Sequence, residues 1–193
     1  MTPPIVLATT SRYKRMLFER LHLTFDCVDA QVDETPRADE PPAELALRLA
    51  LEKARAGARS SAPGAIVIGA DQVASSAAEP HIGKPGTIEN NRRQLQRLSG
   101  QLVRFYTAVA LVDDDSEQTA LDVTEVEFRT LTDAEIDRYL RLEPAPDCAG
   151  GCKVEGLGIS LLAAVRSEDP TGLIGLPLIE LSAMLRARGL PDL

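Results

Sequence analysis

The chain has 193 residues, of which 44% are hydrophobic and 26% are charged, so it can build a core and is not an intrinsically disordered chain. Its formal net charge of -8 argues against a polymeric nucleic acid as partner, because following a phosphate backbone requires a basic face. A small phosphorylated ligand, or a divalent metal held by carboxylates, is compatible with this charge.

The chain begins with short strands and polar turns. Residues 4–10 are predicted to form a buried strand that enters a hydroxyl-rich turn at residues 9–11 and then a helix ending near Leu21. Free backbone N–H groups point outward at such a helix start, which makes it a typical place for phosphate. Residues 23–29 alternate as a second strand, and the polar, proline-rich residues 31–42 are predicted to form a loop.

A helix and a fully apolar strand follow. Two prolines at residues 41–42 suit the start of a helix over about 42–59, which is rich in good helix formers. Residues 65–70 have the composition of a strand buried on both faces, and this strand is expected to end on Asp71. The small and polar residues 74–87 are predicted to form a mobile loop.

The middle of the chain contains a helix from about Glu89 to Leu98, closed by Gly100. Residues 102–112 and 119–129 are predicted to be two longer strands joined by an acidic turn.

The C-terminal part begins with a capping box at residues 132–135, which opens a helix to about Arg141. A loop over 143–153, a strand over 157–166 and an amphipathic helix over 176–188 complete the chain. Strands alternate with helices and then form a hairpin, which predicts an α/β fold: a single domain over 1–193 with a mixed sheet covered by helices.

Two acidic positions have metal-binding chemistry. Asp71 follows a buried strand, where open α/β sheets bind ligands, and there it can hold a metal or polarise water; the alternative is a turn or cap residue. Glu34 lies in a long loop and is an ordinary solvated charge when taken alone. Together with Asp33 and Asp71 it forms an oxygen-ligand set suited to Mg²⁺ or Mn²⁺.

Two lysines are candidates for phosphate binding. Lys53 lies on the leucine-lined face of its predicted helix, where it either extends to solvent or directs its ammonium into a pocket. Lys84 lies between Gly83 and Pro85, which allow close approach and stiffen the chain. A lysine held in this way can bind phosphate as a point charge, and the alternative is an ordinary surface loop.

The location of the protein is predicted from what the sequence lacks. No basic region followed by an apolar stretch opens the chain, and no apolar run approaches the roughly 20 residues of a membrane span. The odd count of three cysteines fits a reducing compartment, so we predict a cytoplasmic protein without a membrane partner. Cys148 and Cys152 are spaced like zinc ligands, but both histidines lie far away, so free thiols are the default.

Seven strings in order resemble one family, the Maf family of nucleotide pyrophosphatases. They cover essentially the whole chain: LATTSRYKR (7–15), DETP (33–36), LALEKA (49–54), IGADQ (68–72), GKP (83–85), FYTAVAL (105–111) and GLPL (175–178). The resemblance implies an α/β fold of the Maf and inosine-triphosphatase-like type, with an elongated mixed sheet and a central cleft between two lobes. It also implies a reaction that uses a divalent cation (Mg²⁺, Mn²⁺ or Co²⁺) and releases pyrophosphate.

The resemblance also assigns roles. It makes Asp71 the proton acceptor and a metal ligand together with Glu34, and it makes Lys53 and Lys84 the phosphate-binding lysines. Ser11 matches the start of the family's SxxR element.

The SxxR element departs from the family at its last position, where Lys14 stands in place of arginine and Arg15 follows. An ammonium cannot make the planar bidentate contact of a guanidinium. Either Lys14 acts as a point charge or Arg15 replaces the arginine.

Three positions bear on the base that is recognised. Tyr13, Gln72 and Glu155, together with CAGGCKVEGLGISL at 148–161, resemble the 7-methyl-GTP pyrophosphatase branch of the family. An electron-rich ring such as Tyr13 attracts a cationic base, and Glu155 can accept hydrogen bonds from guanine. The alternative is that the tyrosine only packs and the glutamate is a loop charge.

Two other functions stay open. One is the same reaction on dTTP, UTP or a modified pyrimidine. The other is a nucleotide-sensing regulator of septum formation without turnover. In each case the expected partner is a small nucleotide, and the apolar 105–111 strand and C-terminal helix make a homodimer possible.

Overall fold

The centre of the structure is a mixed β-sheet. The computed structural model describes residues 3–190, and in these residues six strands form one sheet: β1 (Ile5–Ala8), β2 (Asp26–Val28), β3 (Ile66–Ser76), β4 (Leu102–Val112), β5 (Glu117–Phe128) and β6 (Leu162–Arg166). Their order is β2-β1-β3-β4-β5-β6. The pairs β1/β2 and β1/β3 are parallel, and the remaining pairs are antiparallel.

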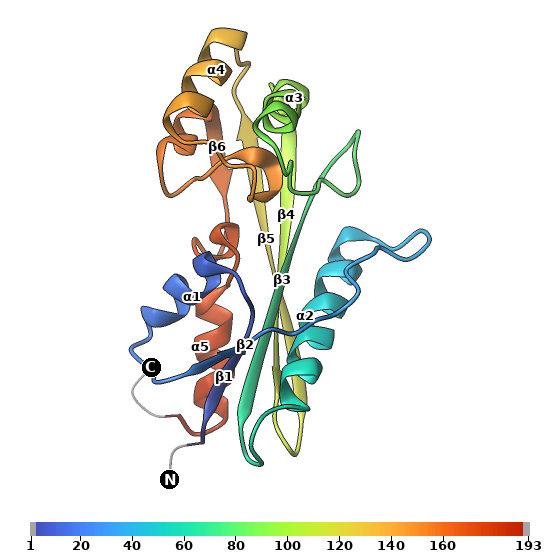
Figure 1. The fold of residues 1–193 in the computed structure, drawn as a ribbon, viewed down its shortest axis with the longest axis vertical. Coiled ribbons are helices and arrows are strands. Elements are labelled where there is room, and N and C mark those ends of the chain that lie inside the picture. The colour runs from blue at the N-terminus through green and yellow to red at the C-terminus, as the bar shows by residue number, and fades with distance from the viewer. Residues whose placement is uncertain (1–2, 191–193) are drawn as a thin grey trace.

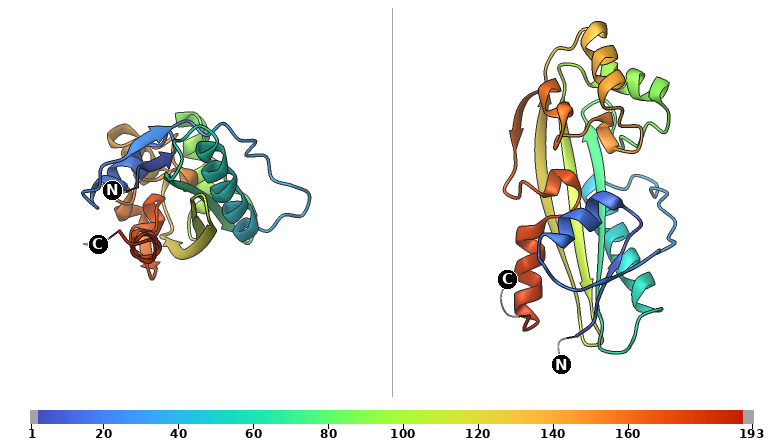
Figure 2. Two further views of the ribbon diagram at one scale, coloured as in Figure 1. Left: turned by 90° about the horizontal axis from the view of Figure 1, so that it is seen from below. Right: turned by 60° about the vertical axis from the view of Figure 1, so that its left-hand side comes forward.

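Five α-helices of the described residues cover this sheet: α1 (Arg12–Glu19), α2 (Pro42–Ala58), α3 (Ile88–Leu98), α4 (Asp133–Leu142) and α5 (Leu178–Ala187). The molecule is elongated, with α3 and α4 at one end and the other helices at the opposite end (Figure 1). Seen along its length, α2 lies on one face of the sheet and α1 with α5 on the other (Figure 2).

The buried apolar residues among those described form four clusters, one in the lobe of α3 and α4 and three in the other lobe. Leu95, Phe128 and Ile136 are buried in the lobe of α3 and α4. Phe18 and Leu181 are buried in the lobe of α1 and α5. Because β3, β4 and β5 run through both lobes, the sheet holds them together (Figure 1).

Most of the predicted elements are confirmed. The α/β class, the mixed sheet and the two-lobed, elongated shape all agree with the prediction. The strand predicted at 102–112 has those bounds. The capping box at Thr132 and Glu135 is formed, with both of its hydrogen bonds present.

Three strand boundaries were wrong. β3 continues to Ser76, into the region predicted as a loop, because it pairs with β4 as far as Ser76 opposite Val103. The strand predicted at 23–29 is reduced to Asp26–Val28. Residues 157–161 form a 3-10 helix instead of a strand, and the backbone N–H of Leu157 donates to the Glu143 carboxylate at 2.7 Å.

The two apolar surfaces named for a homodimer are used inside the chain. The 105–111 segment lies in β4, between β3 and β5, and α5 buries Leu181, Met184 and Leu185 against the sheet. These surfaces therefore give no support to the prediction of a dimer. Over residues 3–190, no helix combines the length and the hydropathy needed to cross a membrane.

Candidate active site

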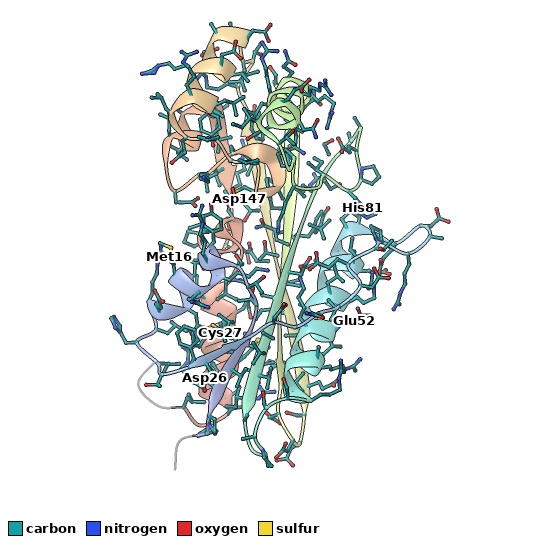
Figure 3. All side chains as sticks on the ribbon, in the orientation of Figure 1. Met16, Asp26, Cys27, Glu52, His81 and Asp147 are labelled. Carbon is teal, nitrogen blue, oxygen red and sulfur yellow. The ribbon has the colours of Figure 1, made fainter. Side chains whose placement is uncertain are left out.

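A cleft of about 770 Å³ lies between the two lobes. Its walls include most of the residues predicted from the sequence: Ser11, Tyr13, Lys14, Glu34, Lys53, Asp71, Gln72, Lys84 and Glu155. Arg15 is exposed and does not line the cleft. His81 and Asp147, which also line it, appear at the middle of the long axis, on opposite sides of the sheet in Figure 3.

Lys53 connects the two acidic candidates. Its Nζ lies 2.5 Å from Glu34 Oε1 and 2.6 Å from Asp71 Oδ1, so both carboxylates converge on one point of the cleft. Burial lowers the pKa of Lys53, but the two carboxylates outweigh that effect and hold the pKa above its usual value. Burial raises the pKa of Glu34, whereas contact with Lys53 lowers it, and the net result is a pKa below the usual range.

Asp71 lies in the middle of β3 and not at its end, so that part of the prediction was wrong. The strand continues because Asp71 pairs with Ala108 of β4. On its other edge, however, β3 loses its parallel partner, because β1 ends at Ala8 opposite Gly69. Thr9, which follows the end of β1, and Asp71, two residues beyond Gly69, both line the cleft. Asp71 therefore lies near the carboxyl end of a parallel strand pair, where open α/β sheets bind ligands.

Gly69 brings α2 close to β3. A Cβ atom at this position would lie 2.1 Å from the carbonyl oxygen of Ala50 and 2.5 Å from the nitrogen of Ala54, both in α2. Only a residue without a side chain allows this approach. The result is that Lys53 of α2 reaches Asp71 of β3 directly.

Lys14, and not Arg15, occupies the cleft at the start of α1. Its Nζ donates to the carbonyl oxygen of Ala70 at 2.6 Å. Burial lowers the pKa of Lys14 to about 8, although the nearby Asp71 carboxylate acts in the opposite direction and raises it. Ser11 caps α1 through its side chain, which accepts from the backbone N–H of Lys14.

Lys84 is exposed, and the segment that carries it is held by hydrogen bonds to the lobe of α3 and α4. The neighbouring Gly83 carbonyl accepts from Gln94 Nε2 at 2.9 Å, and the Gly86 backbone N–H donates to Pro146 at 2.9 Å. Lys84 therefore lies on a segment tied to both α3 and the 144–148 loop.

Tyr13 lies among charged groups that the sequence did not single out. Its hydroxyl accepts from Arg12 Nη2 at 2.6 Å and donates to Asp147 Oδ2 at 3.1 Å. The Arg12 guanidinium carbon lies 4.7 Å from the centroid of the Tyr13 ring. Asp147 lies in a loop far along the chain, and no local pattern marks it as part of a site.

Gln72 uses its amide nitrogen to hold a turn. Nε2 lies within 3.0 Å of Thr107 Oγ1, Gly172 O and Leu173 O, three hydrogen-bond acceptors. Its side-chain oxygen is then the group left for a ligand, as an acceptor. Glu155 is exposed and lines the same cleft.

The donor set fits a divalent cation that also binds the phosphates of a substrate. Glu34 and Asp71 offer two carboxylates at one point, and Mg²⁺ is commonly held by one or two carboxylates plus phosphate oxygens and water. Within residues 3–190, no group of three or more His, Cys, Asp or Glu is arranged to hold a metal. Asp33 does not line the cleft, and its carboxylate accepts from Thr35 N instead.

Comparisons with known proteins agree with this architecture. A family model described as Maf-like protein matches residues 4–188. A protein named 7-methyl-GTP pyrophosphatase from Xanthomonas oryzae pv. oryzae (strain KACC10331 / KXO85) is 54% identical, covering 98% of this chain and 98% of that protein. One of the same name from Bordetella avium (strain 197N) is 52% identical, covering 99% and 96%.

A solved structure, that of the Staphylococcus aureus Ham1 protein, superposes with a TM-score of 0.55 and 16% sequence identity. The match covers 96% of this chain and 99% of that chain. Because the sequence identity is low, the match shows that the two chains share a fold.

Proposed function

This chain belongs to the Maf-like protein family, and we propose that it hydrolyses 7-methyl-GTP to 7-methyl-GMP and pyrophosphate with the help of a divalent cation. The observation that carries the proposal is the convergence of Glu34, Lys53 and Asp71 at one point of a cleft. The names of relatives that are more than half identical over nearly the whole chain support the choice of substrate.

Different residues of the cleft have different roles in the reaction. Lys14, Lys53 and Lys84 supply positive charge for the triphosphate, since catalysis of phosphoryl transfer is mainly positioning and electrostatic stabilisation. Glu34 and Asp71 would hold a divalent cation, which when bound neutralises phosphate charge and lowers the pKa of water.

Asp71 accepts a proton from the attacking water. The new bond forms between the water oxygen and the α-phosphorus, while the bond from that phosphorus to the bridging oxygen breaks. Pyrophosphate then leaves with the electron pair of the broken bond.

The other end of the cleft suits a base that carries positive charge. The Tyr13 ring and the Asp147 and Glu155 carboxylates line the same cleft, and Arg12, which lies beside the ring and pairs with Asp147 at 3.4 Å, offsets part of this negative charge. 7-Methylguanine is cationic, so an aromatic ring and acidic groups favour it over an unmethylated base. The Gln72 oxygen and the Glu155 carboxylate supply acceptors for its N–H groups.

We also propose a cytoplasmic location. Cys27, Cys148 and Cys152 are all free in the structure, as expected for a reducing compartment.

The test is pyrophosphate release by the purified protein with Mg²⁺, Mn²⁺ or Co²⁺, measured across 7-methyl-GTP, GTP, dTTP, UTP and 5-methyl pyrimidine nucleotides. We expect the highest kcat/KM for 7-methyl-GTP. Preference for a pyrimidine nucleotide would support the proposed reaction and contradict 7-methyl-GTP as its substrate. Release from none of them, by folded and metal-loaded protein, would favour a nucleotide sensor.

A further inference from the structure

The segment that carries Glu34 has no regular structure of its own. Residues 29–41 form neither helix nor strand, and the Glu34 side chain is 60% exposed. An exposed side chain on an irregular segment has many accessible positions, so contacts elsewhere must set where its carboxylate lies.

Arg48 of α2 supplies such contacts. Its Nε lies 2.6 Å from Glu40 Oε1 and its Nη2 lies 2.8 Å from Glu40 Oε2, a bidentate pair. Nη2 also donates to the carbonyl oxygen of Thr35, the residue after Glu34, at 3.2 Å. On its own helix, Nη1 reaches Glu52 Oε2 at 3.1 Å.

This pair is shielded from water. The Arg48 side chain is 13% exposed and the Glu40 side chain 7%. Removing one partner of such a largely covered pair is costly, because Glu40 would lose its counter-ion and keep the backbone N–H of Arg37 at 2.9 Å. The planar guanidinium matches the carboxylate with two parallel bonds, which gives the contact a defined direction as well as strength.

Glu40 also connects to the segment that carries Lys84. The Nε2 atom of His81 lies 3.1 Å from the carbonyl oxygen of Glu40. A carbonyl oxygen only accepts, so His81 donates through Nε2. Arg48, Glu40 and His81 therefore join three parts of the chain that bear the candidate residues Lys53, Glu34 and Lys84.

We propose that Arg48 is a positioning residue that sets the place of Glu34 in the cleft. This assignment rests on the proposed function, in which Glu34 is a metal ligand. By holding Glu40 and the Thr35 carbonyl, the guanidinium places the Glu34 carboxylate beside Lys53. Arg48 is absent from the cleft lining and acts through Glu34.

The test compares Arg48→Met and Arg48→Lys with the wild-type protein. The matched control is Arg55→Met: Arg55 lies on the same helix and pairs with Glu117, with side chains 50% and 40% exposed, and it does not line the cleft. Mn²⁺ binding is measured by electron paramagnetic resonance with and without a non-hydrolysable nucleoside triphosphate analogue, because phosphate oxygens are expected to complete the coordination. Circular dichroism and thermal unfolding establish that each variant is folded.

Arg48→Met should weaken Mn²⁺ binding about tenfold or more, the usual effect of losing a group that orients a metal ligand. Arg48→Lys should weaken it less, because it keeps the charge and loses the bidentate contact. Arg55→Met should bind Mn²⁺ like the wild type. In turnover assays the Mn²⁺ concentration for half-activation should rise, with kcat at saturating Mn²⁺ falling much less.

Wild-type Mn²⁺ affinity in a folded Arg48→Met variant would overturn the inference, as would failure of the wild-type protein to bind Mn²⁺ both with and without the nucleotide analogue. If Arg48→Met does not fold, wild-type affinity in Arg48→Lys and in Glu40→Gln would overturn it. Mn²⁺ binding by a wild-type protein that cleaves no nucleotide would count against the proposed function alone, because the binding measurement needs no turnover.

Discussion

Lys53 and Asp71 form the centre of the site at the scale of single residues. Their side chains are each 12% exposed, and 2.6 Å separates their charged atoms. Since Lys53 also contacts Glu34, one ammonium is shared by two carboxylates, and one negative charge is left in excess. This excess of negative charge suits the binding of a further cation.

Asp71→Asn should lower kcat for pyrophosphate release by about 100-fold or more, because the amide cannot accept the proton and is a weak metal ligand. The fold should persist, since the amide has nearly the size of the carboxylate. Turnover and far-ultraviolet circular dichroism are the measurements. Asp26→Asn, a change at an exposed position of β2 outside the cleft lining, is the control and should keep wild-type turnover. Equal rates in both variants would remove Asp71 from the mechanism.

Lys14 gives the site a predicted pH dependence. Burial lowers its pKa to about 8, so its ammonium loses its proton as the pH rises through about 8. A neutral amine does not attract phosphate, and kcat/KM, which reports the free protein, should therefore decline above this pH. Lys14→Arg keeps its charge over that range and should remove the decline. An unchanged alkaline decline in Lys14→Arg would show that another group titrates.

At the scale of elements, the packing of α2 on β3 determines the geometry of the site. Lys53 is on α2 and Asp71 on β3, and Gly69 lets the helix backbone approach the strand. A small change in this packing alters the distance between two functional groups that are not neighbours in the chain.

Gly69→Ala should lower the free energy of unfolding by about 1–3 kcal/mol, because its methyl group would meet helix backbone that cannot move aside easily. Urea unfolding measures this change. Gly83→Ala is a matched control, since a Cβ there meets nothing within 4 Å. A Gly69→Ala variant as stable as Gly83→Ala would show that the α2–β3 contact is looser than the structure indicates.

At the scale of the whole molecule, the long strands make the two lobes one cooperative unit. Ala74 and Phe105 belong to the core of the α3 and α4 lobe, while Ile68 and Leu111, on the same two strands, belong to the core of the other. Unfolding one lobe would break the sheet on which the second depends.

We therefore expect one thermal transition, with equal calorimetric and van't Hoff enthalpies. Leu95→Ala in one lobe and Leu181→Ala in the other, both at fully buried positions, should each lower the midpoint of that single transition. Two resolved transitions, with each substitution moving only one of them, would contradict this expectation. Scanning calorimetry of the wild type and the two variants is the measurement.

Much of the fold followed from the sequence by itself, because its signals are local. Apolar runs and helix caps predicted the order of elements, the β4 bounds and the α4 capping box. The candidate residues were also predicted, but from resemblance to a family more than from their own pattern, since an isolated Glu34 or Lys84 is indistinguishable from a surface charge.

The tertiary structure decided what depends on pairing and packing between distant segments. Pairing with β4 extended β3 through Asp71, and the orientation of α1 placed Lys14 and not Arg15 in the cleft. The contacts of Arg48 with Glu40, and of Asp147 with Tyr13, join residues that no local pattern relates. Periodicity along the chain reports which face of an element is buried, whereas sheet register and close helix packing determine which side chains meet.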